Sequence, residues 1–426
     1  MKRNAFEKIS VVGLGYIGLP TAAMFAACKV QVVGVDVNRK AVDIINEGRI
    51  HIAEPDLDMV VSAAVKEGYL RATTTPEAAE AFLIAVPTPF QGDNHEPNLD
   101  YIEAAVKSIA PVLEKGNLVV LESTSPVGAT ERMAAWLAEA RPDLSFPQDK
   151  GEDSDIRIAH CPERVLPGKV MQELISNDRV IGGMTQACSE RAIALYRTFV
   201  TGECIVASNP SVAEMAKLTE NSFRDVNIAF ANELSVICDR FGLDVWELIA
   251  LANRHPRVNI LQPGPGVGGH CIAVDPWFII SSAPQDARLI RAARNVNDSK
   301  PGWVLDKVQE AIRQHLAAHP EKAEADVAAA CYGLAYKPDI DDLRESPAME
   351  ICRQMVARHP GPLMVVEPNI EELPASLAPA QLVSYERALI GADIHVLLVG
   401  HREFRGFPIE ASGTLNFVKP PARLLF

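Results

Sequence analysis

The 426-residue sequence predicts an α/β protein with two Rossmann-like, doubly wound domains joined by a long central helix and a helical core. Three observations predict this fold class. Short apolar segments alternate with amphipathic segments towards both ends of the chain, which is typical of parallel sheets covered by helices. About 30 residues between these regions have helical periodicity. A Gly-x-Gly-x-x-Gly pattern follows the first apolar segment.

The composition limits the class of protein. Hydrophobic residues make up 48% and charged residues 23% of the chain, which is ordinary for a globular protein and disfavours disorder or coiled coil. The 41 basic and 55 acidic side chains give a formal charge of −14, so we expect neither nucleic acid nor a membrane as partner. No apolar run reaches the roughly 18 residues of a membrane span. Eight scattered cysteines without a Cys-x-x-Cys pair predict a cytoplasmic protein with no metal site.

The first domain is expected over residues 1–207. Its strand candidates are four short apolar segments: Ile9–Gly13, Gln31–Asp36, Ala81–Val86 and Leu118–Ser123. Leu19–Cys28 and Asp100–Leu113 lie between them and have helical patterns. Strands that alternate with helices predict a parallel sheet with helices on both faces.

The central domain, expected over residues 208–318, begins with the long helix. Ser211 supplies an N-cap signal, Glu214 follows three residues later, and Gly242 ends the helical run. Two further helices are predicted: Val245–Ala252 and Ala287–Val308. The segment between them is long and rich in Gly and Pro, which is typical of a functional loop.

The third domain is expected over residues 319–426, where the pattern returns to short apolar segments. Its strand candidates are Val327–Leu334, Leu363–Glu367 and Ile394–Gly400. These segments predict a second parallel sheet.

Three glycines, Gly13, Gly15 and Gly18, lie between the first strand candidate and the first helix candidate. In this context the first glycine permits a tight turn, the second lets a pyrophosphate approach the backbone, and the third lets helix and strand pack closely. Asp36 ends the next strand candidate, where its carboxylate accepts hydrogen bonds from a ribose and repels a 2′-phosphate. The pattern favours NAD over NADP, and the alternative is a plain structural turn.

Lys217, Asn221 and Arg224 are spaced i, i+4 and i+7 on the long helix. This spacing places an ammonium, an amide and a guanidinium on one stripe of the helix. The stripe is either a solvated face or part of a binding site near the Gly-rich loop.

Cys271 lies in that loop, in GVGGHCIAVDP, with His270 before it and Asp275 four residues after it. A cysteine in a flexible, polar segment has the accessibility that a thiolate nucleophile needs. The alternative is inert packing, which is the usual role of a cysteine side chain.

A polar segment, YKPDIDDLRESPA, follows the first strand candidate of the third domain. Asp339, Asp341 and Asp342 have oxygen ligands for a metal, but their spacing matches no standard loop and Lys337 and Arg344 oppose it. The segment is therefore either a solvated turn or a loop whose two cations contact ligand phosphates.

Seven motifs in order resemble those of the UDP-glucose/GDP-mannose dehydrogenase family: GLGYIGLP, VPTP, ESTSPVG, AHCPERVLPG, AEMAKLTENSFRD, GPGVGGHC and YKPDIDDLRESP. The resemblance runs from about residue 9 to about residue 400. The segment HPRVNILQPGPGVGGHCIAVDPWFI is most similar to the UDP-N-acetyl-D-mannosamine dehydrogenase branch. The closing GTLNFVKPPARLLF departs from the family because it lacks a short apolar strand and a Gly-containing finish.

The resemblance implies an NAD-dependent enzyme that oxidises the primary alcohol of a UDP-sugar to a carboxylate, a four-electron reaction. The implied cofactor contacts are Gly13, Gly15, Tyr16, Ile17, Gly18, Asp36, Thr88, Thr130 and Arg344. The implied substrate contacts are Arg164, Val165, Lys217, Asn221, Arg224, His255, Arg257, Gly268, Tyr336 and Lys337.

The same resemblance implies the catalytic roles. Cys271 attacks an aldehyde intermediate, so that a thiohemiacetal and then a thioester form. Lys217 and Asn221 stabilise the developing oxyanion, and Lys217 also moves a proton. Glu163, Asp275 or both handle the hydrolytic water.

The implied substrate is UDP-N-acetyl-D-mannosamine. The product, UDP-N-acetyl-D-mannosaminuronate, would serve surface polysaccharide of the enterobacterial common antigen type. The alternative substrate is UDP-N-acetylglucosamine or another UDP-sugar. The long helix resembles the dimerisation core of the family, which implies a homodimer.

Two other classes of protein share part of this pattern. A 6-phosphogluconate or β-hydroxyacid dehydrogenase shares the first domain and the Lys-x-x-x-Asn helix but needs neither Cys271 nor a third domain. A non-catalytic regulator keeps the glycines without needing the thiol or the lysine. The number of NADH molecules formed per substrate separates the three classes: two, one or none.

Overall fold

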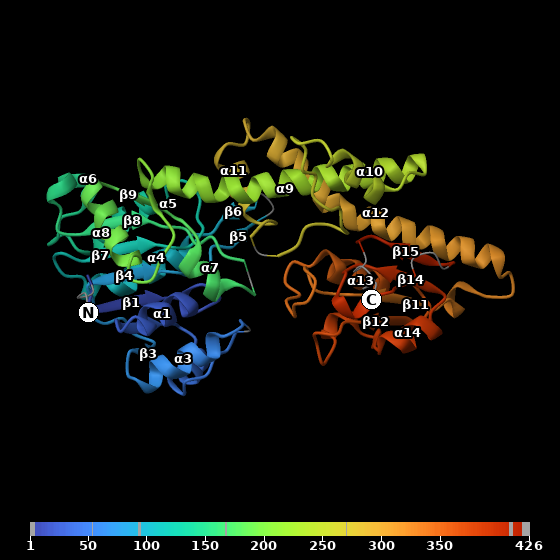
Figure 1. Cartoon of the computed structure of the whole chain (residues 1–426), viewed down its shortest axis with the longest axis horizontal. Helices are drawn as coiled ribbons and strands as arrows, with labels where there is room; N and C mark the ends of the chain where they lie inside the picture. Colours follow the sequence, from blue (N-terminus) through green and yellow to red (C-terminus); the bar gives the residue numbers. More distant parts are fainter. Residues whose placement is uncertain are drawn as a thin grey trace. The chain divides into compact units, whose positions relative to one another are not determined.

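The computed structural model describes residues 5–52, 54–92, 95–166, 168–269, 271–408 and 412–419. The chain divides into two compact units (Figure 1): unit 1 comprises residues 1–220 and 277–283, and unit 2 comprises residues 221–276 and 284–426. The boundary after Glu220 falls inside the long helix α9 (Pro210–Phe241). The three domain ranges expected from the sequence therefore stay predictions. None of the described helices combines the length and the apolarity needed to cross a bilayer.

Unit 1 contains an eight-stranded sheet in the order β10-β9-β8-β7-β4-β1-β2-β3. The strands are β1 (Lys8–Val12), β2 (Gln31–Val35), β3 (Leu70–Thr73), β4 (Ala81–Ile84), β7 (Leu118–Leu121), β8 (Arg157–His160), β9 (Arg179–Gly183) and β10 (Cys204–Val206). All neighbours pair in parallel except β8 and β9. The order reverses between β1 and β4, which is where doubly wound sheets bind ligands.

Helices cover both faces of this sheet. One face packs against α1 (Gly18–Ala27), α3 (Leu57–Lys66), α7 (Val170–Ser176) and α8 (Gln186–Tyr196). The other packs against α4 (Asp100–Ile109) and α5 (Ala129–Ala140). Unit 1 also holds α2 (Arg39–Asn46), which packs on the same face as α1. It further holds α6 (Pro147–Lys150), the short hairpin of β5 (Phe90–Gln91) and β6 (Glu96–Pro97), and two 3₁₀ turns, η1 (Ala110–Val112) and η2 (Gly151–Asp153), together with parts of α9 and α11 (Asp275–Ser282). β4 and β7 are buried throughout, as expected for a sheet covered on both faces.

Unit 2 contains an all-parallel five-stranded sheet in the order β13-β12-β11-β14-β15. Its strands are β11 (Ala329–Tyr332), β12 (Leu363–Val366), β13 (Gln381–Leu382), β14 (Ile394–Leu397) and β15 (Thr414–Asn416). One face packs against α12 (Arg288–Ala318) and α13 (Pro347–Arg358), and the other against α14 (Tyr385–Gly391) and η5 (Arg402–Phe404). Unit 2 also holds α10 (Val245–Ala252), η3 (Glu324–Asp326) and η4 (Ala375–Leu377). The second doubly wound sheet is thus confirmed.

Three local predictions need correction. The N-cap of α9 is not Ser211, whose hydroxyl donates to Glu131; instead the Asn209 Oδ1 accepts from the N–H of Val212 at 2.9 Å. The closing segment does contain a strand, β15, whose three half-buried residues are too short and too polar for an apolar-run signal. Helix α12 continues beyond the predicted end at Val308 to Ala318, because its buried stripe continues through Ile312.

Candidate active site

The glycine turn between β1 and α1 leaves room for a ligand. A Cβ atom at Gly18 would lie 1.7 Å from the carbonyl oxygen of Gly13, so the packing of the turn itself requires glycine there. A Cβ atom at Gly15, in contrast, would meet no heavy atom of the described residues within 4 Å. The chain has no steric need for glycine at that position, which fits the close approach of a pyrophosphate.

Asp36 lies directly after β2, beside this turn. Its Oδ2 accepts from the N–H of Leu14 at 2.9 Å, and its Oδ1 accepts from the N–H of Asn38 at 2.8 Å. These bonds fix the half-buried carboxylate at the edge of the sheet. Each oxygen of an ionised carboxylate has a second lone pair, so both remain able to accept from ribose hydroxyls.

Two threonines predicted as cofactor contacts have different surroundings. The Oγ1 of Thr88, which follows β4 across the switch point, is buried and has no hydrogen-bond partner among the described residues. Such an orphaned hydroxyl fits a position where a ligand supplies the partner. Thr130 is fully buried, and its hydroxyl donates to Glu214 Oε1 at 2.6 Å. Its contact with the cofactor stays a prediction.

Cys271 is the one exposed thiol among the eight cysteines, all of which the structure describes. It lies one turn before α11 (Asp275–Ser282), and the N–H of Asp275 donates to the Cys271 carbonyl oxygen at 2.8 Å. The Nδ2 of Asn221, on α9, donates to Asp275 Oδ2. Both Asn221 and Asp275 are buried. The structure therefore brings together three of the predicted catalytic residues in unit 2, whereas His270 lies outside the described residues.

The other cysteines have the surroundings of structural thiols. Burial raises the pKa of Cys28, Cys161 and Cys204 above the ordinary thiol value. A hydrogen bond of the Cys352 thiol with Cys331, together with burial, does the same for Cys352. Thiols held in the protonated form are poor nucleophiles, so Cys271 is the candidate that exposure favours.

Lys217 lies one helical turn before Asn221 on α9, and Arg224 lies one turn after it. Lys217 is half-buried and Arg224 is exposed. Residues at this spacing lie on one side of a helix, but Asn221 in the middle of the stripe is buried, so the binding role of the stripe stays a prediction.

The Gly-rich loop before Cys271 packs closely against the polar segment YKPDIDDLRESPA of the third predicted domain. A Cβ atom at Gly268 would lie 2.6 Å from the Glu345 carbonyl oxygen and 2.7 Å from the Cβ of Tyr336. The loop is also tied to α9, because Asn232 Oδ1 accepts from the N–H of Gly264 at 2.9 Å. Gly268 and Tyr336, both predicted substrate contacts, are thus neighbours.

Comparison with known proteins identifies the family. Three profiles of one family match consecutive parts of the chain: the NAD binding domain over residues 7–200, the central domain over 211–299 and the UDP binding domain over 330–422. The chain belongs to the UDP-glucose/GDP-mannose dehydrogenase family. It is an NAD-dependent dehydrogenase; the glycine turn and Asp36 predicted the NAD, and the family resemblance predicted the dehydrogenase.

Individual relatives cover nearly the whole chain. It is 66% identical over 407 residues to UDP-N-acetyl-D-mannosamine dehydrogenase of Yersinia pestis, an alignment that covers 95% of this chain and 96% of the relative. It is 64% identical to NDP-N-acetyl-D-galactosaminuronic acid dehydrogenase of Ralstonia nicotianae, with 94% and 92% covered. The solved structure of UDP-D-ManNAc dehydrogenase from Pyrococcus horikoshii superposes with a TM-score of 0.86 at 37% identity, and covers 98% and 97%.

The CPERVLPG segment of this dehydrogenase is held by ion pairs. Glu163 is buried, and its carboxylate pairs with the buried guanidinium of Arg179 while also accepting from the N–H of Arg164 at 2.7 Å. Arg164 itself makes a bidentate pair with Glu220, at 3.1 and 2.7 Å. The substrate contacts of Arg164 and of half-buried Val165 stay predictions.

Glu54 is a positioning residue that the sequence analysis missed. Its buried carboxylate accepts from the N–H groups of Gly168 at 3.0 Å and Val170 at 2.8 Å, and so caps α7 and holds the end of the CPERVLPG segment. No local signal identifies it, because its partners lie more than a hundred residues away in the sequence.

His255 and Arg257 lie exposed on a closed loop in unit 2. Asn253 closes the loop by two reciprocal bonds with Ile260, at 3.0 and 2.7 Å. The two basic side chains are thus presented on a defined turn, although their contact with a substrate stays a prediction.

Arg344 of the YKPDIDDLRES loop has its partner within the loop. Arg344 makes a bidentate bond to Asp342, at 2.9 and 2.6 Å, and the N–H of Tyr336 donates to the Asp342 carbonyl oxygen at 3.2 Å. An anion that contacts Arg344 must therefore compete with Asp342. Contacts of Arg344 with the cofactor and of Lys337 with the substrate stay predictions.

Replacement of Asp36 tests its role in cofactor choice. Asp36→Ala should weaken NAD binding by about 1–3 kcal/mol, because hydrogen bonds to a charged group are lost. The ratio of kcat/KM for NADP to that for NAD should rise, because the negative charge is gone. Asp36→Asn is the matched control: it keeps an acceptor oxygen but not the charge. A wild-type enzyme that uses NADP as well as NAD would contradict the assignment.

Proposed function

We propose that the enzyme oxidises the C6 alcohol of a UDP-linked 2-acetamido sugar to a carboxylate through a covalent intermediate on Cys271. The observation that supports this proposal is the position of the exposed Cys271 thiol, one turn before Asp275, whose carboxylate is bonded to Asn221. A single-oxidation dehydrogenase of related fold needs no such thiol.

The proposed reaction has two oxidations and one hydrolysis. NAD supplies the oxidising power, with one molecule accepting a hydride in each oxidation. The first oxidation removes a hydride from the alcohol carbon and a proton from its hydroxyl, giving an aldehyde. The Cys271 thiolate adds to the aldehyde carbon, and the thiohemiacetal loses a hydride and a proton to become a thioester. Water then breaks the carbon–sulfur bond and releases the carboxylic acid and the thiol.

Lys217 and Asn221 stabilise the negative oxygen that forms when the thiolate adds. A fixed ammonium and a fixed amide are most effective where charge develops in a site that excludes water. The Asn221 amide is fixed because its Nδ2 already donates to Asp275. Lys217 also accepts and returns the alcohol proton in this proposal.

Asp275 is the better candidate of the two carboxylates for activating the hydrolytic water. It lies one turn from Cys271, on the segment that carries the nucleophile, whereas Glu163 is buried in an ion pair with Arg179. A general base must lie within hydrogen-bond reach of the water that it activates. We therefore assign the water to Asp275 and a positioning role to Glu163.

UDP-N-acetyl-D-mannosamine is the proposed substrate. This proposal is supported by the relative that is 66% identical and carries that specificity in its name. A second candidate is the galacto epimer, because another relative at 64% identity is named for N-acetyl-D-galactosaminuronic acid. UDP-N-acetylglucosamine is the third. The product would enter surface polysaccharide synthesis in the cytoplasm.

A homodimer is the proposed assembly. Phe223, Phe230 and Ile237 recur every seven residues on α9 and are exposed, the first two by 67% and 53%, and Leu251 on α10 is 65% exposed. Apolar side chains at this spacing form one stripe of a helix. A second copy of the chain would remove this stripe from water, as the family resemblance implies.

Replacement of the nucleophile tests the covalent scheme. Cys271→Ser should lower formation of the carboxylate by roughly a thousandfold or more, and should leave at most a slow first oxidation. The measurement is NADH formed per substrate consumed, which should be two for the wild type, together with the mass of the product. Cys28→Ser, at a half-buried thiol, should behave as the wild type. Carboxylate formation by Cys271→Ser at the wild-type rate would exclude the scheme.

A panel of epimers tests the substrate. We expect kcat/KM for UDP-N-acetyl-D-mannosamine to exceed that for its gluco and galacto epimers by at least about tenfold, since a wrongly directed substituent leaves buried polar groups unpaired. A preference for either other epimer would overturn the substrate assignment and leave the mechanism intact.

A charge on the α9 stripe tests the dimer. Phe230→Asp should shift the molar mass measured by light scattering from that of two chains towards that of one, because a buried unpaired charge is costly. Ile390→Asp, at an 88% exposed position on α14, is the control and should leave the mass unchanged. A monomeric wild type would end the proposal.

A further inference from the structure

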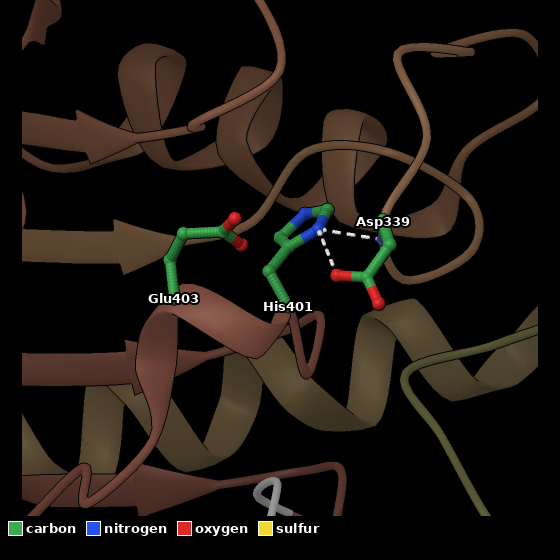
Figure 2. A group of neighbouring side chains, drawn as sticks. All are labelled: Asp339, His401 and Glu403. Carbon is green, nitrogen blue, oxygen red and sulfur yellow. Dashed lines mark hydrogen bonds and ion pairs between the residues drawn. The ribbon is translucent and has the colours of Figure 1, made fainter.

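Three loops meet around His401 at the carboxyl edge of the sheet in unit 2 (Figure 2). They follow β11, β12 and β14, and they contribute Asp339, Glu367 and His401. Figure 2 shows two of these side chains, Asp339 and His401. The imidazole of His401 is fully buried, its Nε2 lies 3.0 Å from Glu367 Oε2, and its Nδ1 accepts from the N–H of Asp339 at 2.9 Å. These two bonds define the neutral tautomer in which Nε2 carries the hydrogen.

The contact between Asp339 and the His401 segment is reciprocal. While its N–H donates to His401, its Oδ1 accepts from the N–H of Arg402 at 2.9 Å. Asp339 has a φ of +63°, a left-handed conformation that is unfavourable for most side chains and is tolerated by Asp and Asn. The two bonds hold the loop in a conformation that it would otherwise rarely adopt.

We propose that Asp339, held by His401 and Arg402, is a positioning residue for Tyr336 and Lys337 in the nucleotide-sugar site. This inference rests on the proposed function, in which Tyr336 and Lys337 bind the UDP group. Asp339 itself does not touch the substrate in this proposal, and acts through the two residues that precede it in the loop.

The loop has a fixed base as well as a fixed tip. At its base the N–H groups of Leu334 and Ala335 donate to Glu367 Oε2, at 2.7 and 3.1 Å. Tyr336 and Lys337 therefore lie between an anchor at residue 335 and an anchor at Asp339. When both ends of so short a segment are fixed, the directions of the side chains between them are fixed as well.

Glu367 has the electrostatics of a permanent anchor. Burial alone would raise the pKa of this carboxyl, but the hydrogen bonds from His401 and from the N–H groups of Leu334 and Asn369 lower it below the ordinary value. The carboxylate is thus ionised at neutral pH. Its charge favours the tautomer of His401 whose Nδ1 accepts from Asp339.

The loop also contacts the catalytic segment within unit 2. A Cβ atom at Gly269 would lie 3.0 Å from the Tyr336 ring, and one at Gly268 would lie 2.7 Å from the Tyr336 Cβ. These glycines come just before Cys271. A displacement of Tyr336 would therefore disturb both the binding of the nucleotide and the position of the nucleophile.

A metal site is the competing explanation for these side chains. One ligand atom each of Asp339, His401 and Glu403 lie within 4.8 Å of one another. However, the Nδ1 lone pair of His401 already accepts from Asp339 and lies 3.2 Å from Asn369 Nδ2, while Nε2 is bonded to Glu367. The imidazole has no lone pair left for a cation. The geometry therefore favours the role of Asp339 as a positioning residue held by His401 and Arg402.

Three replacements of the exposed Asp339 separate its contributions. Asp339→Asn keeps both the acceptor oxygen and the tolerance for a left-handed backbone, and should behave as the wild type. Asp339→Gly keeps only the tolerance for a left-handed backbone. Asp339→Ala keeps neither that tolerance nor the acceptor oxygen. We expect KM for the nucleotide sugar, and Kd for UDP measured by calorimetry, to rise about two- to tenfold in the Gly variant and further in the Ala variant. KM for NAD should not change.

Asp341→Ala removes the same charge from the same loop but leaves the bonds of Asp339 to His401 and Arg402 in place. It should leave KM for the nucleotide sugar, Kd for UDP and KM for NAD unchanged. Equal effects of Asp339→Ala and Asp341→Ala, or a rise in KM for NAD that matches the rise for the sugar, would overturn the proposal. Loss of activity in Glu403→Gln, or on treatment with EDTA, would favour the metal instead. Failure of the wild type to bind UDP would contradict the proposed function and not the hydrogen bonds that hold Asp339.

Discussion

The core of unit 2 depends on a buried ion pair between its two long helices. The Arg294 Nη1 of α12 donates to the Asp225 Oδ1 of α9 at 2.6 Å, and both side chains are almost fully buried. Asn297 donates to the same carboxylate and accepts from Asn232, which in turn holds Gly264. Because a buried charge without its partner is costly, this chain of bonds permits one alignment of the helices and fixes the start of the loop that leads to Cys271.

The sequence was most informative where chemistry and local conformation coincide. The glycines before α1 and the segment around Cys271 are recognisable because one residue type satisfies a steric need and a chemical need at the same place. The parallel sheets were recognisable for a similar reason, since strands covered on both faces are continuously apolar. These features depend on neighbours within a few residues of one another.

Other features depend on partners that are remote in sequence. Glu54 caps a helix more than a hundred residues away, and Arg164 pairs with Glu220. Ser211 was predicted as the N-cap because it carries a hydroxyl that can accept from a helical N–H group. In the structure Asn209 accepts that bond, and the Ser211 hydroxyl donates to Glu131 instead. Neither bond is visible in a linear pattern. Strand β15 was missed because its residues are paired by β14 and are not selected for their own apolarity.

The exposure of one thiol in eight has a practical consequence. Reagents and oxidants that require a thiolate in contact with solvent act on the accessible sulfur first. Five of the other seven cysteines are buried, and burial raises the pKa of the remaining two, Cys28 and Cys204. One equivalent of an alkylating reagent therefore suffices to count the molecules in a preparation whose Cys271 thiol is intact. For the same reason, oxidative damage to the enzyme will concentrate at the thiol that is proposed as its nucleophile.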